Sequence, residues 1–119
     1  MNTKDNNVSS NMKILTLIIK QTFFDQIVSG EKKNEYREIR PSNAQKYVIE
    51  DGENVEPVKY DAIRFYAGYN KDRATALFAV KNALIEILED EEGNDIVYEE
   101  NGQEYVMAQM NYELGDKIE

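Results

Sequence analysis

The sequence predicts an α+β fold that is mainly β: a small barrel of five to six strands, mostly antiparallel, with one or two N-terminal helices packed beside it. Short apolar or alternating segments recur along the chain, with turn residues between them. One segment near the start has the apolar spacing of a helix. Further along, Asn101-Gly102 is a strong hairpin signal between two expected strands.

The first two elements are a strand and a helix. Residues 13–19 form an apolar run rich in β-branched side chains, which predicts a buried strand. Residues 21–29 carry apolar side chains at helical spacing, and we expect Thr22 to be the N-cap and Gly30 to follow the helix. The aromatic and aliphatic residues expected in the core are Phe23, Phe24, Ile27, Phe65 and Phe78.

The remaining strands are expected at 34–39, 60–66, 76–88, 96–99 and 103–114. The alanines and leucines of residues 76–88 would allow a helix, but their alternation favours a long bent strand. Residues 42–50 are expected to form a short helix. Residues 51–59 contain Gly52 and Pro57 and are expected to form a loop.

The length of 119 residues predicts one domain, at residues 13–119, after a polar and disordered tail at residues 1–12. The tail lacks the apolar centre of a signal peptide. No apolar run is long enough to cross a bilayer, so we expect a cytoplasmic protein with no membrane partner.

The chain contains neither cysteine nor histidine. This composition excludes disulfides, thiolate zinc sites, cysteine nucleophiles and every Ser-His-Asp arrangement. The acidic run at residues 89–92 is typical of a solvated turn, and no Asp-x-Asp-x-Asp loop is present. We therefore expect no metal and no cofactor.

The net charge of −9 is unevenly distributed. Residues 1–81 hold 13 Lys and Arg against 11 Asp and Glu, whereas residues 82–119 hold one against 12. An acidic protein is poorly suited to indiscriminate phosphate binding, but a local basic cleft can still bind a short nucleic acid or one nucleotide. The asymmetry favours a site in the first two-thirds of the chain; the alternative is that acidic loops only keep the protein soluble.

The most informative segment is Gly30-Glu31-Lys32-Lys33-Asn34-Glu35-Tyr36-Arg37. If residues 34–39 form a strand, Glu35 and Arg37 share one of its faces. A carboxylate beside a guanidinium can form a polar site. The alternative is a solvated edge strand with a surface ion pair of little energetic value.

Residues 14–40, with the Ser-Gly-Glu-Lys-Lys-x-Glu-Tyr-Arg segment, resemble the opening of the ASCH domain, a member of the PUA-like superfamily. Residues 60–73 (Tyr-Asp-Ala-Ile-Arg-Phe-Tyr-Ala-Gly-Tyr-Asn-Lys-Asp-Arg) are similar to the third strand and following loop of small bacterial and phage members. Residues 80–87 and 112–116 look like later strands of the family. The resemblance implies a PUA-like barrel, a cleft between barrel and helices, and an association with RNA.

One ASCH branch hydrolyses the amide of N4-acetylcytidine. Its catalytic lysine corresponds to Lys32 and its arginine to Arg37, but its catalytic threonine falls on Glu35, which is not a hydroxyl nucleophile. The resemblance therefore implies that, if the protein is an enzyme, Lys32 and Glu35 are its catalytic residues, with Glu35 as general base.

The candidate ligand-binding residues are Lys20, Lys32, Glu35, Arg37, Tyr69, Lys71 and Arg73. Lysine and arginine bind phosphate, Glu35 accepts from a base amino group or orients Arg37, and Tyr69 stacks on a base. For each residue the alternative is an ordinary solvated side chain or a structural ion pair.

Three functions follow, in order of preference. The first is a monomeric module that binds RNA, a nucleotide or a modified nucleoside in a charged cleft. The second is an amidohydrolase on an acylated nucleoside. The third is an accessory protein whose acidic C-terminal third meets a basic partner.

Overall fold

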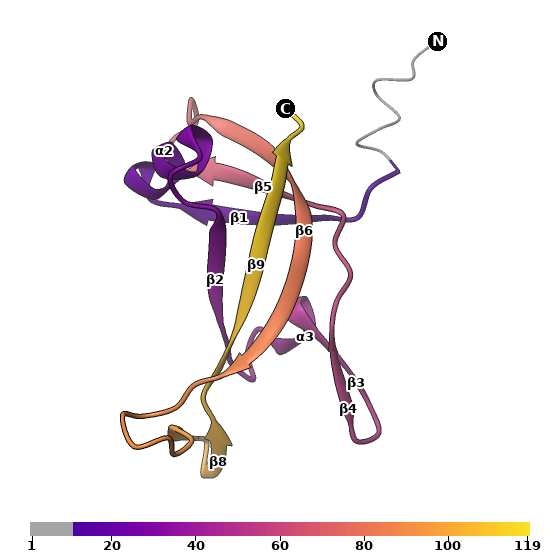
Figure 1. Cartoon of the computed structure of the whole chain (residues 1–119), viewed down its shortest axis with the longest axis vertical. Helices are drawn as coiled ribbons and strands as arrows, with labels where there is room; N and C mark the ends of the chain where they lie inside the picture. The colour runs from indigo at the N-terminus through magenta and orange to yellow at the C-terminus, as the bar shows by residue number, and fades with distance from the viewer. Residues whose placement is uncertain (1–10) are drawn as a thin grey trace. The chain divides into compact units, whose positions relative to one another are not determined.

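The computed structural model describes residues 11–119. It is mainly β, as the sequence predicts, and has two helices (Figure 1). The helices are α2 (Gln21–Ser29) and α3 (Ala44–Tyr47). The strands are β1 (Ile14–Ile19), β2 (Asn34–Ile39), β3 (Val48–Asp51), β4 (Asn54–Pro57), β5 (Ala62–Ala67), β6 (Thr75–Ile87), β7 (Val97–Glu100), β8 (Gln103–Val106) and β9 (Ala108–Lys117).

Five strands form one mixed sheet in the order β1-β5-β6-β9-β2, and the pairs β3-β4 and β7-β8 form separate two-stranded ladders. β1 and β5 run parallel in the register Ile14↔Ala62 to Ile19↔Ala67, whereas β5 and β6 are antiparallel. The parallel pair is possible because α2, β2, α3 and the β3-β4 hairpin connect its strands, which gives the chain length to return in the same direction.

The chain divides into two compact units, and β6 and β9 run through both. Unit 1 comprises residues 11–34, 59–82 and 113–119 of the described chain, and unit 2 comprises residues 35–58 and 83–112. Residues 1–10 of the expected tail lie outside the described residues.

Unit 1 has an apolar core between its strands and α2. The side chains of Leu15, Leu17, Ile63 and Phe65 alternate inward along β1 and β5 and are buried. α2 packs on β5, and Phe65 meets Phe78 edge to face at 6.2 Å between ring centroids.

Unit 2 contains most of β2, α3, both hairpins, the end of β6 and the first half of β9, and its core is smaller. Tyr47, Met110 and Tyr112 are its buried residues of greatest size, and the two tyrosine rings lie 6.5 Å apart. Two hydrogen bonds tie Met107 to the segment before β7: Met107 N–H donates to Ile96 O at 2.7 Å, and Leu88 N–H donates to Met107 O at 2.9 Å.

The helix predicted at 21–29 is confirmed, and Gly30 ends it in the left-handed region at φ 85°. Thr22 was the wrong N-cap: Lys20 holds the cap position and makes no side-chain cap bond, because the helix begins at the residue after it. Phe23 was wrongly placed in the core. It is 44% exposed because Phe24 and Ile27, three residues apart, form the stripe that faces the sheet.

The loop predicted at 51–59 is wrong, since Val48 to Pro57 form the β3-β4 hairpin around Gly52 at φ 66°. The helix expected at 42–50 is shorter, because Val48 already adopts extended geometry. The long strand over 76–88 is confirmed as β6. The expected strand at 103–114 is two strands, β8 and β9. It is interrupted at Met107, whose backbone bonds to Ile96 and Leu88 instead of to a strand partner.

No helix in the described part of the chain is both long and apolar enough to cross a membrane.

Candidate functional site

The predicted site residues occupy three places in the structure. Lys20, Tyr69, Lys71 and Arg73 belong to one edge of unit 1, and Lys32 belongs to a cavity of the same unit. Glu35 and Arg37 lie on β2, in unit 2. We describe each of these places in turn.

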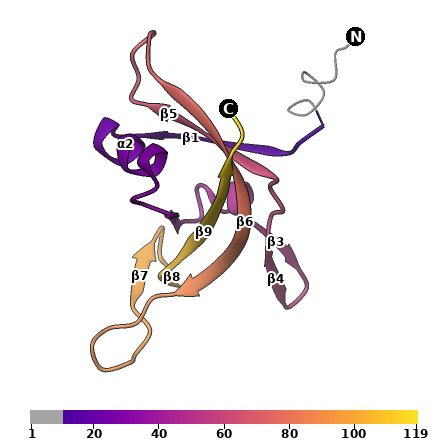
Figure 2. The ribbon, with the colours of Figure 1, turned by 45° about the horizontal axis from the view of Figure 1, so that its top comes forward.

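Lys20 and the loop after β5 meet at the carboxyl ends of the parallel strands β1 and β5. Ile19 pairs with Ala67, and Gly68 N–H donates to Ile19 O at 2.8 Å. Lys20 follows Ile19 directly, so the register brings it to the edge where the loop begins. Figure 2 shows the loop that connects the end of β5 to the start of β6.

Within this loop, Tyr69 is 83% exposed and Lys71 is also exposed. Arg73 is held in place: its guanidinium lies over the Tyr66 ring, with Cζ 4.1 Å from the ring centroid, and it donates to Gly68 O at 3.4 Å. An exposed aromatic ring in the same loop as two cations is a small surface on which a base can stack and a phosphate can bind.

Lys32 is positioned by the turn that ends α2. Gly30 N–H donates to Ile27 O at 3.1 Å, and Lys32 N–H donates to Gln26 O at 3.0 Å. Ser29 Oγ reinforces the turn by donating to Gln26 O at 3.1 Å and accepting from Glu31 N–H at 3.3 Å. The Lys32 ammonium donates to Asn34 O, so its charge is held beside the start of β2.

This turn forms one wall of a cavity of about 710 Å³ in unit 1. Its second wall is β6 and its third is the last part of β9, which Leu114 N–H joins to Lys33 O at 2.9 Å. The lining residues are Ile27, Gly30, Lys32, Lys33, Phe78, Ala79, Lys81, Glu113, Leu114, Gly115 and Asp116. Its volume lies within the usual range for small-ligand sites, about 300–1,000 Å³.

The cavity has an apolar floor and a charged rim. Ile27, Phe78 and Leu114 are buried in the floor. The rim carries three lysines, at 32, 33 and 81, against the carboxylates of Glu113 and Asp116. Lys81 Nζ lies 3.7 Å from Glu113 Oε2 in a pair that is mostly exposed, so water screens it and the ammonium can turn to a ligand.

Glu35 and Arg37 form the ion pair that their strand spacing predicts, with Arg37 Nε donating to Glu35 Oε2 at 2.9 Å. Glu35 is buried, which the alternative of a solvated surface pair does not explain. Neither residue lines the lysine cavity among the described residues. The pair is therefore part of the packing of unit 2.

Residues 11–119 contain no group of three or more histidine, cysteine, aspartate or glutamate side chains placed to hold a metal ion.

Sequence reasoning missed Lys33, Lys81, Glu113 and Asp116. Lys33 stood inside the segment singled out above, next to the chosen Lys32. Lys81 and Glu113 carry no motif, and only the knowledge that β6 pairs with β9 brings them together. The signal that could have found Asp116 is the Leu-Gly-Asp sequence. Its glycine, Gly115, lies against Ala79 of the cavity, where a Cβ would be in contact, and Asp116 follows it directly.

Comparison of the chain with protein-family models, with curated proteins and with solved structures gives no match.

Proposed function

We propose that unit 1 binds a short single-stranded RNA or a nucleotide, with its phosphates at the lysine cavity. The observation that carries this proposal is the gathering of Lys32, Lys33 and Lys81 around one hollow with an apolar floor. The lysines meet phosphate oxygens. Phe78 and Ile27 offer apolar surface to a base or sugar, and Glu113 and Asp116 accept from amino or hydroxyl groups.

The charge of unit 1 supports this proposal. The described part of unit 1 carries ten Lys and Arg against seven Asp and Glu, in a chain whose net charge is −9. Phosphate binding depends on such local positive charge, and it weakens as salt rises. The resemblance to the ASCH domain points in the same direction, and with it we propose membership of that family and closure of the sheet into a PUA-like barrel.

The Tyr69 loop favours an oligonucleotide over a single nucleotide. β6 joins the loop to the cavity, since Arg73 precedes Thr75 and Phe78 lines the hollow. The five residue-to-residue steps from Arg73 to Phe78 span at most about 17 Å of extended chain, a distance that a few nucleotides can bridge. A base stacked on Tyr69 and phosphates near Lys71 and Lys81 would then belong to one strand.

The amidohydrolase alternative receives less support. The catalytic threonine of that ASCH branch falls on Glu35, which has no hydroxyl nucleophile and whose carboxylate is already paired with Arg37. We therefore prefer a binding role for Lys32.

The test is fluorescence anisotropy with a short fluorescein-labelled single-stranded RNA at low salt. We expect Lys32→Ala and Lys81→Ala each to weaken binding about tenfold, because each removes a charge-assisted hydrogen bond worth about 1.5 kcal/mol. Each should also reduce the slope of log affinity against log salt concentration by about one, which is the contribution of one phosphate contact.

Lys59→Ala is the matched control, because Lys59 is an exposed lysine of unit 1 outside the cavity. Circular dichroism checks that each variant is folded. If wild type binds neither the RNA nor a nucleoside triphosphate, or if Lys59→Ala weakens binding as much as Lys32→Ala does, the proposal is wrong.

A further inference from the structure

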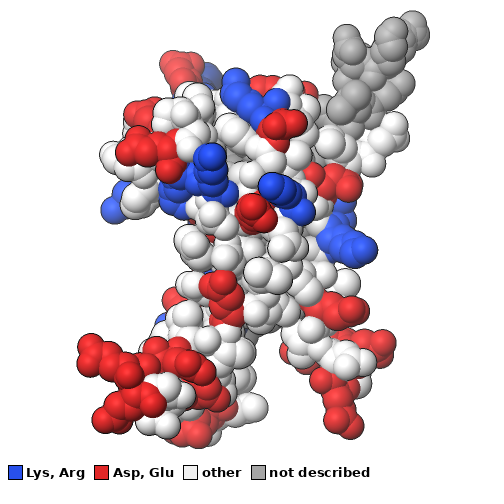
Figure 3. All heavy atoms as spheres, viewed as in Figure 1, with Lys and Arg blue, Asp and Glu red and all other residues white. Residues whose placement is uncertain are grey.

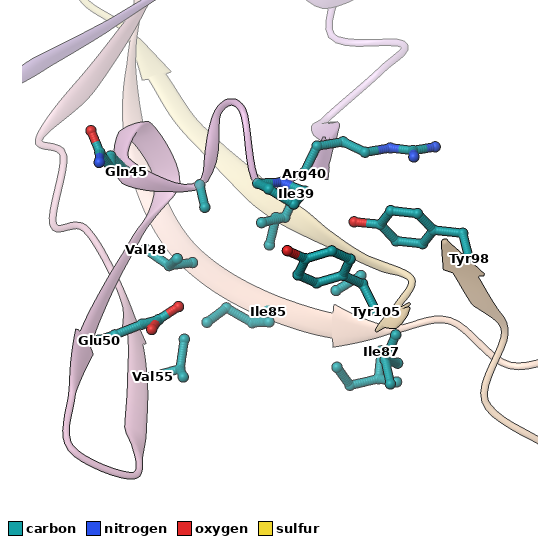
Figure 4. Close-up of a pocket in the computed structure, with 14 residues that line it drawn as sticks. Ile39, Arg40, Gln45, Val48, Glu50, Val55, Ile85, Ile87, Tyr98 and Tyr105 are labelled. Carbon is teal, nitrogen blue, oxygen red and sulfur yellow. The ribbon is translucent and has the colours of Figure 1, made fainter. Parts of the chain in front are cut away.

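Unit 2 contains an apolar groove that the proposed phosphate site does not use. The groove has a volume of about 690 Å³ and lies between the β3-β4 hairpin, the end of β6 and the β7-β8 hairpin. Figure 4 shows Tyr98 and Tyr105 on one side, Val48 and Val55 on the other, and Ile85 of β6 between them. The two tyrosine rings stack at 5.6 Å between centroids, which fixes that wall.

Several aliphatic side chains in this groove remain open to solvent. Val55 on β4 is 51% exposed and Ile87 on β6 is 52% exposed, and both line the groove. Leaving such side chains in water forgoes about 25 cal/mol for each Å² that a partner could cover. A concave apolar surface of this kind is typical of a site that another molecule fills.

The charge around the groove selects the partner. Glu50 is a lining residue, and the one cation of the lining, Arg40, is already paired: its Nη2 lies 2.7 Å from Glu38 Oε2 and its Nη1 lies 3.8 Å from Glu100 Oε1. Arg40 also lies over the Tyr98 ring, with Cζ 4.2 Å from the centroid. Three carboxylates against one guanidinium leave the rim negative.

Unit 2 as a whole has the same sign. It carries 15 Asp and Glu against three Lys and Arg. Figure 3 shows acidic side chains crowded over the β7-β8 hairpin with its preceding loop, and at the tip of the β3-β4 hairpin. Such a field repels phosphate groups and attracts cations, so a nucleic acid is unsuited to this groove.

We propose that the groove of unit 2 binds a basic segment of a partner protein, whose aliphatic side chains fill the hollow and whose lysines or arginines meet the surrounding carboxylates. The chain's own first ten residues, Met-Asn-Thr-Lys-Asp-Asn-Asn-Val-Ser-Ser, do not have this chemistry, because their single lysine is offset by an aspartate. The partner segment is therefore supplied by another chain.

The test uses the full chain and a short labelled peptide in which lysine alternates with leucine. Binding is measured by fluorescence anisotropy at low and high salt. We expect saturable binding that weakens at high salt. A peptide of the same charge, with serine in place of leucine, should bind at least about tenfold more weakly, because it cannot bury apolar surface. A glutamate-leucine peptide should not bind.

Two matched pairs of variants locate the site. Val55→Ser and Ile87→Ser remove exposed aliphatic side chains from the groove. Ile49→Ser and Leu84→Ser remove side chains of similar exposure, 52% and 49%, from the same hairpin and the same strand, outside the groove lining. We expect the first pair to weaken peptide binding about fivefold or more and the second pair to leave it unchanged.

Lys32→Ala should leave peptide binding unchanged, which separates this result from the test of the phosphate site. Equal effects of all four serine variants, or equal binding of the leucine and serine peptides, would overturn the proposal. Sedimentation that shows a dimer of wild type, dissociated by Val55→Ser, would also overturn it, because the groove would then be covered by a second copy.

Discussion

Two glutamate-arginine pairs, one within β2 and one at its end, have the same spacing and different surroundings. Glu35 and Arg37 pair at 2.9 Å, and Glu38 and Arg40 pair at 2.7 Å. The Glu35 side chain is 8% exposed and the Glu38 side chain is 44% exposed. Strand alternation produces this difference, because residues three apart point to opposite faces. Spacing predicts both pairs, and only burial distinguishes their energies.

We expect Glu35→Ala to lower the free energy of unfolding by about 3 kcal/mol, because it leaves a half-buried guanidinium without its carboxylate. Glu38→Ala should cost less than about 1 kcal/mol, since water screens the exposed pair. Urea unfolding followed by circular dichroism measures both. Equal losses would mean that burial does not control the strength of these pairs.

At this scale, the sequence was informative about residue type and poor about accessibility. The helical spacing of 21–29 identified Phe24 and Ile27 as core residues and wrongly added Phe23. A helix stripe is defined to within one residue by periodicity, and the sheet it packs on decides its limits. Closeness in sequence is also a poor guide for Lys32, Glu35 and Arg37, because Lys32 belongs to unit 1 and the other two belong to unit 2.

Within unit 2, the pairing of strands β6 and β9 is reinforced by one carboxylate. Glu86 on β6 accepts hydrogen bonds from Asn111 Nδ2 and Gln109 Nε2 on β9, each at 2.9 Å. The Asn111 amide first, and then the Gln109 amide, lower the pKa of the Glu86 carboxyl below its ordinary value of 4.5. The ionised form is thus favoured by the folded chain.

This arrangement makes the β6-β9 contact sensitive to acid. Because the folded pKa of Glu86 is lowered, its stabilisation is fully present above pH 4.5 and is lost as the pH falls through the folded value. We expect the stability difference between wild type and Glu86→Gln to be constant above that pH and to shrink below it. Thermal unfolding at several pH values measures the difference, and Glu56→Gln on the exposed β4 controls for general charge effects. A difference that does not change with pH would contradict the expectation.

The two hairpins show why some elements are predictable and others are not. Asn101 and Gly102 both have positive φ, 53° and 79°, which is the geometry that an Asn-Gly turn selects, and that hairpin was predicted. The β3-β4 hairpin also turns at a glycine, after Asp51, but half of its strand residues are Glu, Asp or Asn, and β4 ends at Pro57. Such residues have low strand propensity, so the ladder there depends on pairing that the local sequence does not reveal.

At the scale of the whole molecule, the chain crosses between the units four times, and two of these crossings lie inside the long strands β6 and β9. β6 passes from unit 1 into unit 2 after Asn82, and β9 passes back after Tyr112. The parallel pairing of β1 with β5 could not be anticipated from the sequence, because it joins segments far apart in the chain. The lysine cavity depends on that long-range assembly for the same reason, and so only one of its charged residues, Lys32, was selected beforehand.

We expect the two units to unfold together, because breaking β6 or β9 in one unit interrupts a strand of the other. Native-state hydrogen exchange measures this. Amides of buried residues, such as Phe65 in unit 1 and Met110 in unit 2, should show the same free energy of opening. Two distinct values would mean that the units are separate domains and that the prediction of one domain is wrong.

The two-stranded ladders β3-β4 and β7-β8 leave outer backbone edges that no further strand of the described chain pairs. Edges of this kind are templates for fibrous stacking between molecules. Here they carry Glu50, Glu56, Glu99 and Glu104, whose mutual repulsion between neighbouring molecules opposes such growth. The negative charge of the later part of the chain thus opposes self-association. A binding partner that neutralises this charge must also cover the strand edges, or the molecules become able to pair through them.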